Sequence, residues 1–285
     1  MPMKFEAIGA DNGYGEVTWT HKDAILYALG VGAGQDDALS ELQFTTENSQ
    51  DVTQQMLPAY GVVLGMTYGT RPDIGDYHLS QVLHGEQSFV VHKPLPIAGS
   101  AKIGTVTTGI YDKGKGALAV LESTVADAAT GEVWVTSQTG LFIRGEGGFG
   151  GDPQPVVEWS VPERDADIDA SSTIREDQAL LYRLSGDRNP LHSDPKFAAM
   201  AGFPRPILHG MCTYGVTGRL LINALCGGDA SRVKGMGGRF SKPVMPGETI
   251  TVSVWKQDGS AVFQTRNSNG DVVLDRGTFD YTEAN

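Results

Sequence analysis

The chain has 285 residues, of which 40% are hydrophobic and 20% are charged, and its formal net charge is −12 at pH 7. This composition is typical of a folded protein, and the length allows two modest domains or one large domain. The acidic excess would repel a nucleic-acid backbone, so we expect no nucleic-acid partner.

The cysteines and the chain ends favour the cytoplasm. Cys212 and Cys226 are too few for a disulfide framework, which indicates a reducing compartment, and we expect both to be buried. We find no stretch of signal-peptide or membrane-spanning character, so no membrane association is expected. The last residues (YTEAN) do not form a Ser-Lys-Leu peroxisomal address.

In chain order, the first half predicts a short helix followed by antiparallel strands. An apolar run begins at Tyr60-Gly61-Val62 and soon meets Gly65, Gly69 and Pro72, so the helix should be shortened or broken. Strand-like runs follow at residues 104–110, 117–121 and 132–136, with a turn at residues 112–116.

A glycine-rich and proline-rich stretch at residues 144–155 (RGEGGFGGDPQP) has little apolar content, so we expect a flexible linker. Its glycines do not lie at a strand-to-helix junction, which argues against a nucleotide-binding loop.

The second half predicts a buried helix of about five turns at residues 207–226, because its large apolar residues recur at helical spacing. Residues 249–254 alternate apolar and polar side chains, and two more strand-like runs follow around Val262 and Val272, separated by the turn signals Asp258-Gly259 and Asn269-Gly270.

Short signatures recur across the linker and suggest a duplicated unit. Tyr27 corresponds to Tyr182, Tyr60-Gly61-Val62 to Tyr214-Gly215-Val216, and Lys93-Pro94 to Lys242-Pro243, with offsets of 155, 154 and 149. Leu83-His84-Gly85 and Leu208-His209-Gly210 also look alike, but their offset of 125 is out of register. We therefore divide the chain into residues 1–150 and residues 151–285.

The most informative segment for chemistry is residues 182–192 (YRLSGDRNPLH). Gly186 permits an unusual turn and Pro190 favours an extended residue before it, so Asp187 and His192 can converge from one loop. A carboxylate and an imidazole that share a water can divide general acid–base work. The alternative is that Asp187 caps the next turn and His192 is an ordinary core histidine.

The pattern Tyr-x-Leu-Ser-Gly-Asp-x-Asn-Pro-Leu-His in this segment resembles the hydratase 2 signature of MaoC-like proteins. The similarity extends through Phe197-Ala198 and residues 202–211 (GFPRPILHGM). It implies an α+β double hot-dog fold, in which two tandem units each wrap an antiparallel sheet around a central helix. The first unit lacks the signature, since residues 28–34 read ALGVGAG, and it would only help to bind acyl-CoA.

The resemblance also implies an (R)-specific enoyl-CoA hydratase. In this family, water adds to a trans-2-enoyl-CoA in the syn sense and gives a (3R)-hydroxyacyl-CoA, and the reverse dehydration uses the same groups. Asp187, Asn189 and His192 would hold the water, while the backbone N–H of Gly210 would stabilise charge on the thioester oxygen. Without the resemblance, Gly210 could equally well only start the long helix.

The residues that the resemblance places at the substrate are His84, Gly85, Lys113, Arg188, Pro190, Leu191 and Phe240. Lys113 could meet the phosphates of coenzyme A, with help from Arg239 and Lys242. The alternatives are that Lys113 is an exposed turn residue, that Phe240 belongs to the core and that His84 is a surface histidine. An acyl tunnel, for which we expect long or branched chains, could be lined by Met56, Leu57, Tyr60, Val62, Val63 and Leu64.

We expect no metal and no redox cofactor, since His192 and His209 have no partner at zinc-motif spacing in the sequence. Coenzyme A enters only as part of the substrate. The resemblance implies a homodimer. Because the sequence carries no fused dehydrogenase or lipid-carrier domain, we expect separate partner enzymes. The rival functions are a hot-dog acyl-CoA thioesterase and a non-catalytic acyl-CoA-binding protein or assembly subunit.

Overall fold

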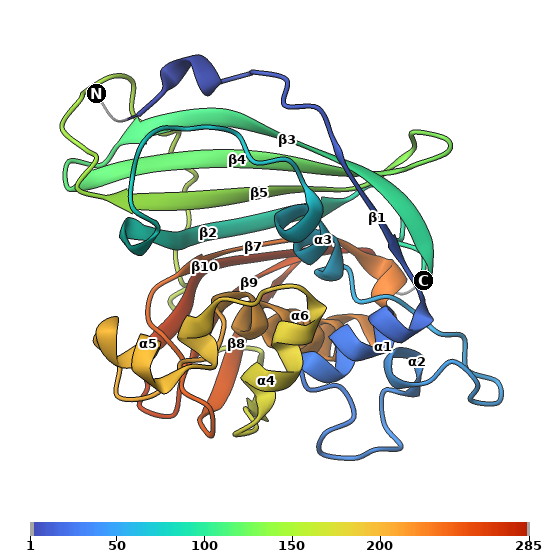
Figure 1. The fold of residues 1–285 in the computed structure, drawn as a ribbon. Helices are drawn as coiled ribbons and strands as arrows, with labels where there is room; N and C mark the ends of the chain where they lie inside the picture. Colours follow the sequence, from blue (N-terminus) through green and yellow to red (C-terminus); the bar gives the residue numbers. More distant parts are fainter. Residues whose placement is uncertain (1–2, 284–285) are drawn as a thin grey trace.

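A computed structural model describes residues 3–283, so residues 1–2 and residues 284–285, the end of the C-terminal pentapeptide considered above, lie outside the described residues. Ten strands form one antiparallel sheet in the order β1-β3-β4-β5-β2-β7-β10-β9-β8-β6 (Figure 1). The strands are β1 (Gly15–Trp19), β2 (Val82–Val91), β3 (Gly99–Asp112), β4 (Gly116–Asp127), β5 (Val133–Arg144), β6 (Ile168–Thr173), β7 (Val233–Phe240), β8 (Thr249–Gln257), β9 (Ser260–Arg266) and β10 (Val272–Tyr281).

The strand order repeats itself about the centre of the sheet. Read from each edge, the order is β1-β3-β4-β5-β2 in the first half and β6-β8-β9-β10-β7 in the second, so each strand corresponds to the one numbered five higher. The halves meet where β2 pairs with β7, from Glu86 opposite Arg239 to Val90 opposite Gly235. This repeat agrees with the duplicated signatures in the sequence.

The sheet curves over the helices, which occupy its inner side (Figure 1). The α-helices on this side are α1 (His21–Gly30), α2 (Leu42–Thr45), α3 (Tyr60–Tyr68), α4 (Gln178–Tyr182), α5 (Pro195–Met200) and α6 (Gly210–Cys226). Short 3-10 helices lie elsewhere along the chain, at Phe5–Ala7, Leu79–Gln81, Arg183–Ser185, Pro190–His192 and Ala230–Arg232. No helix among residues 3–283 is long and apolar enough to cross a membrane.

The central helices differ in length, as predicted. α6 has 17 residues, nearly all of them buried, and ends at Gly227, whose φ of 62° is the left-handed conformation of a helix C-cap. Its counterpart α3 has 9 residues and leaves helical geometry at Gly69. Gly61 lets α3 approach the sheet closely, because a β-carbon there would lie 3.0 Å from Val135.

No strand signal in the sequence pointed to β2 and β7, although they form the centre of the sheet. β7 contains Gly235, Gly237 and Gly238, which remove the alternation of side chains that predicts a strand. β2 carries an irregularity between His84 and Glu86, which breaks the two-residue period. The expectation of one helix per half was also too simple, because α1 and α2 precede α3 in the chain.

The expectation of a flexible linker after residue 144 was wrong. The carboxylate of Asp112 accepts hydrogen bonds from the N–H groups of Gly148 at 2.9 Å and Gly150 at 2.6 Å. Phe149 between them packs edge-on against Phe5 at 5.2 Å and joins a second hydrophobic cluster. The segment is therefore anchored to the β3–β4 turn, and its one large apolar side chain does enter a core.

Candidate functional site

The loop that carries the candidate site begins at Gly186, a position where any other residue would be strained. After α4 and the 3-10 turn at Arg183–Ser185, Gly186 takes a φ of +143°. A β-carbon at Gly186 would lie 2.5 Å from Oγ1 of Thr67, in the last turn of α3. The first half of the chain thus supports the loop that presents Asp187.

The loop then turns back on itself through its own polar groups. The N–H of Asn189 donates to Oδ1 of Asp187 at 3.1 Å, and the N–H of Leu191 donates to Oδ1 of Asn189 at 3.0 Å. The capping interpretation of Asp187 is therefore correct for one carboxylate oxygen. The 3-10 helix Pro190–His192 follows and carries His192 inward, while Arg188 and Pro190 remain exposed.

His192 is buried and held in one tautomer. Its Nδ1 lies 2.9 Å from the carbonyl oxygen of Ile207, which can only accept, so Nδ1 carries the proton and Nε2 keeps a free lone pair. Burial lowers the pKa of His192 and outweighs the Ile207 carbonyl and the Asp187 charge, which both favour the protonated ring. A neutral imidazole with a free Nε2 can accept a proton.

His209 is a site residue whose role the sequence did not reveal. Its ring stacks on His192 with centroids 3.8 Å apart, and its Nε2–H donates to the backbone carbonyl of Asp187 at 3.3 Å. The ring is fully buried, and its Nδ1 has no hydrogen-bond partner among the described residues. Burial, followed by the neighbouring His192, lowers the pKa of His209 to about 3.

The sequence spacing showed no third partner for the two histidines, but the fold does bring a carboxylate close to both of them. Polar side-chain atoms of Asp187, His192 and His209 all lie within 4.8 Å of one another. Two of the four ring nitrogens are already bonded to backbone carbonyls, and the rings are stacked rather than turned toward a common point. The absence of a metal requirement stays a prediction.

The N-terminus of α6 opens beside this pair. Helical hydrogen bonding starts with the N–H groups of Cys212 and Thr213, which donate to the carbonyl of His209, so the N–H of Gly210 is left for another acceptor. Gly210 is exposed and stands at the positive end of the helix dipole. This position suits an oxygen atom on which negative charge develops.

His84, Gly85 and Phe240 lie at the same site. The irregularity at Gly85 turns His84 to the inner face of β2, where its ring meets Phe240 edge-on at 4.7 Å. Phe240 in turn lies against Gly210: a β-carbon at Gly210 would be 3.4 Å from the phenyl ring. Burial lowers the pKa of His84 to about 4, so its ring is neutral at pH 7.

The cationic residues lie at the periphery of the site. Lys113 is exposed in the β3–β4 turn and donates to Gln154 at 2.7 Å, and Gln154 donates to Glu86 at 3.2 Å, next to Gly85. Lys242 forms an exposed ion pair with Asp271 at 2.6 Å, which leaves its ammonium group less available to a phosphate than that of Lys113.

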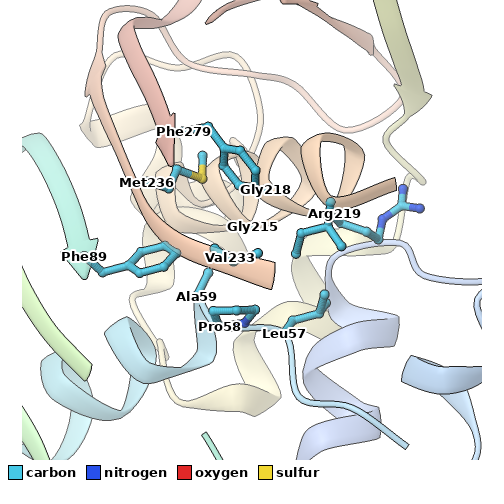
Figure 2. A pocket seen from close by; sticks show the side chains of 11 residues that line it. Leu57, Pro58, Ala59, Phe89, Gly215, Gly218, Arg219, Val233, Met236 and Phe279 are labelled. Atoms are coloured by element: carbon cyan, nitrogen blue, oxygen red, sulfur yellow. The ribbon is translucent and has the colours of Figure 1, made fainter. Parts of the chain in front are cut away.

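The expected tunnel residues are all buried, and some surround hollows. Figure 2 shows Leu57, Phe89, Met236 and Phe279 around the glycine face of α6; this space of about 10 Å³ is too small for an acyl chain without side-chain movement. A second hollow of about 330 Å³ shares Pro58 with the first and is also lined by Met56 and Leu95.

Two half-sheets that each wrap around a central helix form a double hot-dog fold, as expected. Its second half carries the complete hydratase 2 signature at the N-terminus of the longer central helix. Fold and site together define a double hot-dog protein of the hydratase 2 class.

The chain belongs to the MaoC-like dehydratase family. Residues 159–277 match the MaoC like domain, and residues 17–145 match the MFE-2 hydratase 2 N-terminal domain. The chain is 46% identical to the 3-hydroxyacyl-thioester dehydratase Y of Mycobacterium tuberculosis, over 92% of this chain and 93% of the relative. It is 38% identical to an Arabidopsis thaliana protein named peroxisomal enoyl-CoA hydratase 2, over 87% of this chain and 85% of the relative. A solved MaoC-like dehydratase from Phytophthora capsici superimposes with a TM-score of 0.86 at 34% identity and covers 95% of this chain and 94% of its own.

Proposed function

We propose that this protein is an (R)-specific enoyl-CoA hydratase, a hydro-lyase that interconverts trans-2-enoyl-CoA and (3R)-hydroxyacyl-CoA. The observation that carries the proposal is the convergence of Asp187 and His192 beside the open N-terminus of α6. The names of the Mycobacterium tuberculosis and Arabidopsis thaliana relatives support it, because both name the chemistry of adding or removing water.

In the proposed mechanism, one water lies between the Asp187 carboxylate and Nε2 of His192. As its oxygen bonds to C3, the unprotonated Nε2 accepts a proton from the water, and the pair returns a proton to C2. Both events use the same face of the substrate, so the addition is syn. The side-chain N–H₂ of Asn189 is free to bind the water, because its oxygen already accepts from Leu191.

Charge moves to the thioester oxygen while the C3–O bond forms. The N–H of Gly210 and the helix dipole behind it favour this charge without any rearrangement. We propose that His84, Gly85, Phe240 and Leu191 contact the substrate around this point, with Lys113, Arg188 and Pro190 along the outer edge. No metal or redox cofactor is part of this proposal.

The test follows the loss of enoyl-thioester absorbance with crotonyl-CoA and a medium-chain trans-2-enoyl-CoA, and resolves the product on a chiral column. We expect (3R)-alcohol from the wild type and a rate about 10²–10⁴ lower for Asp187→Asn or His192→Gln. Asp177→Asn, an exposed carboxylate paired with Arg175, is the control. Release of free CoA without loss of the double bond would mean a thioesterase, and binding without turnover would mean an acyl-CoA-binding protein.

We also propose a homodimer in the cytoplasm and a preference for long or branched acyl chains. Two buried free cysteines support a reducing compartment, although the Arabidopsis thaliana relative is named peroxisomal. The hollow of about 330 Å³ beside Pro58 supports room for bulk. Light scattering after size exclusion tests the dimer, cell fractionation tests the location, and kcat/KM across chain lengths tests the preference.

A further inference from the structure

A buried glutamine, Gln87, lies behind His84 and has no role in the site described above. Oε1 of Gln87 is 3.0 Å from Nε2 of His84, and the hydroxyl of Thr139 donates to the same oxygen at 2.9 Å. The amide nitrogen of Gln87 donates to the backbone carbonyls of Ser88 and Gln138, both at 2.9 Å. Gln87 is only 2% exposed, so its amide lies away from solvent behind the half-buried His84.

These contacts determine which nitrogen of His84 carries the proton. Two backbone carbonyls can only accept, so the amide must turn its N–H₂ toward them and its oxygen toward His84. His84 Nε2 must then be the donor, which leaves Nδ1 of the neutral ring as a hydrogen-bond acceptor. Burial dominates the lowered pKa of His84; the hydrogen bond to Gln87, the backbone carbonyl of Glu86 and, least of all, the charge of Asp187 favour protonation but do not offset it.

An enoyl-CoA offers few donors that such an acceptor could bind. The enoyl group and the thioester carry no N–H, and the nearest is the amide of the pantetheine arm, two carbons from the sulfur. Phe240 lies between Gly210 and His84 and touches both, so the ring of His84 stands one side chain away from the proposed thioester oxygen site. This separation suits the first amide rather than a more distant one.

We propose that Gln87, supported by Thr139, is a positioning residue that fixes His84 in the Nε2–H tautomer, so that Nδ1 accepts a hydrogen bond from the first pantetheine amide. The inference rests on the proposed hydratase function and adds how the enzyme recognises the thioester arm. It assigns Gln87 no part in the chemical step.

The test compares two short substrates that differ in one atom. S-crotonyl-N-acetylcysteamine keeps the amide N–H, and S-crotonyl-2-acetoxyethanethiol has an ester oxygen in its place. We expect wild-type kcat/KM to be about tenfold higher for the amide, as one hydrogen bond allows. In Gln87→Met, whose side chain fixes no tautomer, the ratio should fall toward one, mainly through KM.

Two further variants keep the test decisive if Gln87→Met is unstable. Gln87→Glu places a carboxylate beside His84 and keeps the ring protonated, so Nδ1 becomes a donor and the amide preference should again be lost. Gln264→Met, another buried strand glutamine outside the site, should retain the wild-type ratio. An unchanged ratio in both Gln87 variants, or no amide preference in the wild type, overturns the inference. Failure of the wild type to hydrate either substrate or crotonyl-CoA would instead overturn the proposed function.

Discussion

His209 connects three parts of the site through one side chain. It donates to the backbone of Asp187, stacks on His192 and directly precedes Gly210. Two substitutions separate these contacts: His209→Phe keeps a ring against His192 but loses the donor, whereas His209→Gln keeps a donor but loses the ring.

We expect kcat to fall about five- to tenfold in His209→Phe with little change in KM, because the loop that carries Asp187 loses one hydrogen bond. His209→Gln should recover part of this loss if the donor is the important contact. Steady-state kinetics at saturating substrate measure both. A fully active His209→Phe enzyme would mean that the bond to the Asp187 carbonyl does not position the loop.

The same histidines predict how stability depends on pH. The pKa is lowered to about 4 in His84 and to about 3 in His209, and it is also lowered in His192, whereas an unfolded chain titrates near 6.5. Below pH 6.5 the unfolded state therefore binds more protons, and the free energy of unfolding falls as the pH drops toward 4. Each excess proton contributes a slope of about 1.4 kcal/mol per pH unit.

Urea unfolding at several pH values measures this slope, and the His209→Phe variant should show a shallower one between pH 6.5 and 4. A slope identical to that of the wild type would mean that His209 titrates normally in the folded state.

Among the individual site residues, those that lie close together in the chain could be predicted from the sequence. Asp187, Asn189 and His192 fall within six residues, so their convergence follows from a glycine and a proline in the same loop. His209 reaches Asp187 from 22 residues further along the chain, and no local pattern encodes that contact. Gln87 stands only three residues after His84, but the groups that orient its amide, Thr139 and the carbonyl of Gln138, belong to another strand. Their roles depend on hydrogen-bond geometry, which composition and spacing do not contain.

Among the elements, α6 owes its close packing to glycines that are not equivalent. A β-carbon at Gly215 would lie 2.6 Å from Val31 and 2.8 Å from the hydroxyl of Tyr27, whereas one at Gly218 would meet only the flexible sulfur of Met236, at 3.3 Å. We expect Gly215→Ala to lower the free energy of unfolding by about 1–3 kcal/mol. Gly218→Ala should cost less than Gly215→Ala, and chemical denaturation compares the two. Equal losses would contradict the packing argument.

The anchored segment after β5 provides a second prediction for an element. Asp112→Ala removes the carboxylate that holds Gly148 and Gly150, so residues 145–155 should become accessible to protease and the Lys113 turn should loosen. Limited proteolysis with mass spectrometry locates the cuts. Asp127→Ala is a matched control, because that carboxylate binds only its own turn at Ala129 and Thr130. Equal cleavage in both variants would refute the anchoring role.

Strands were predictable where side chains alternate regularly or where turn signals mark their ends, and they were missed where both signals are weak. β8 alternates regularly, glycine turns separate β9 and β10 from their neighbours, and the structure confirms all three. The glycines of β7 and the bulge of β2 hide the same period. The linker was misjudged because a single phenylalanine and one distant carboxylate hold it, and neither is apparent from local composition.

Across the whole molecule, a buried ion pair ties the first half to the second. Arg219 of α6 pairs with Glu41 at 2.8 Å, and their side chains are 5% and 12% exposed. Asn223 and the N–H of Gly34 also donate to Glu41, and Ser172 accepts from Arg219, so every charge is matched.

Replacing one partner should be costly, because it leaves the other charge buried without compensation. We expect Glu41→Leu or Arg219→Met to lower the free energy of unfolding by about 3–5 kcal/mol, and the double variant to lose less than the sum. Lys242→Met, which breaks an exposed pair, should cost no more than about 1 kcal/mol. Guanidinium denaturation measures all four, and additive losses would argue against a coupled pair.

The pairing of β2 with β7 within one chain affects how the two halves respond to dilution and which sequence constraints each half is under. Both strands belong to one polypeptide, so their association has no concentration dependence, and the seam persists at dilutions that separate subunits. Both halves are also passed on together, so only one of them has to keep the Asp-x-Asn-Pro-Leu-His run. The other half is under no such constraint on its loop or its helix, and its α3 has 9 residues where α6 has 17.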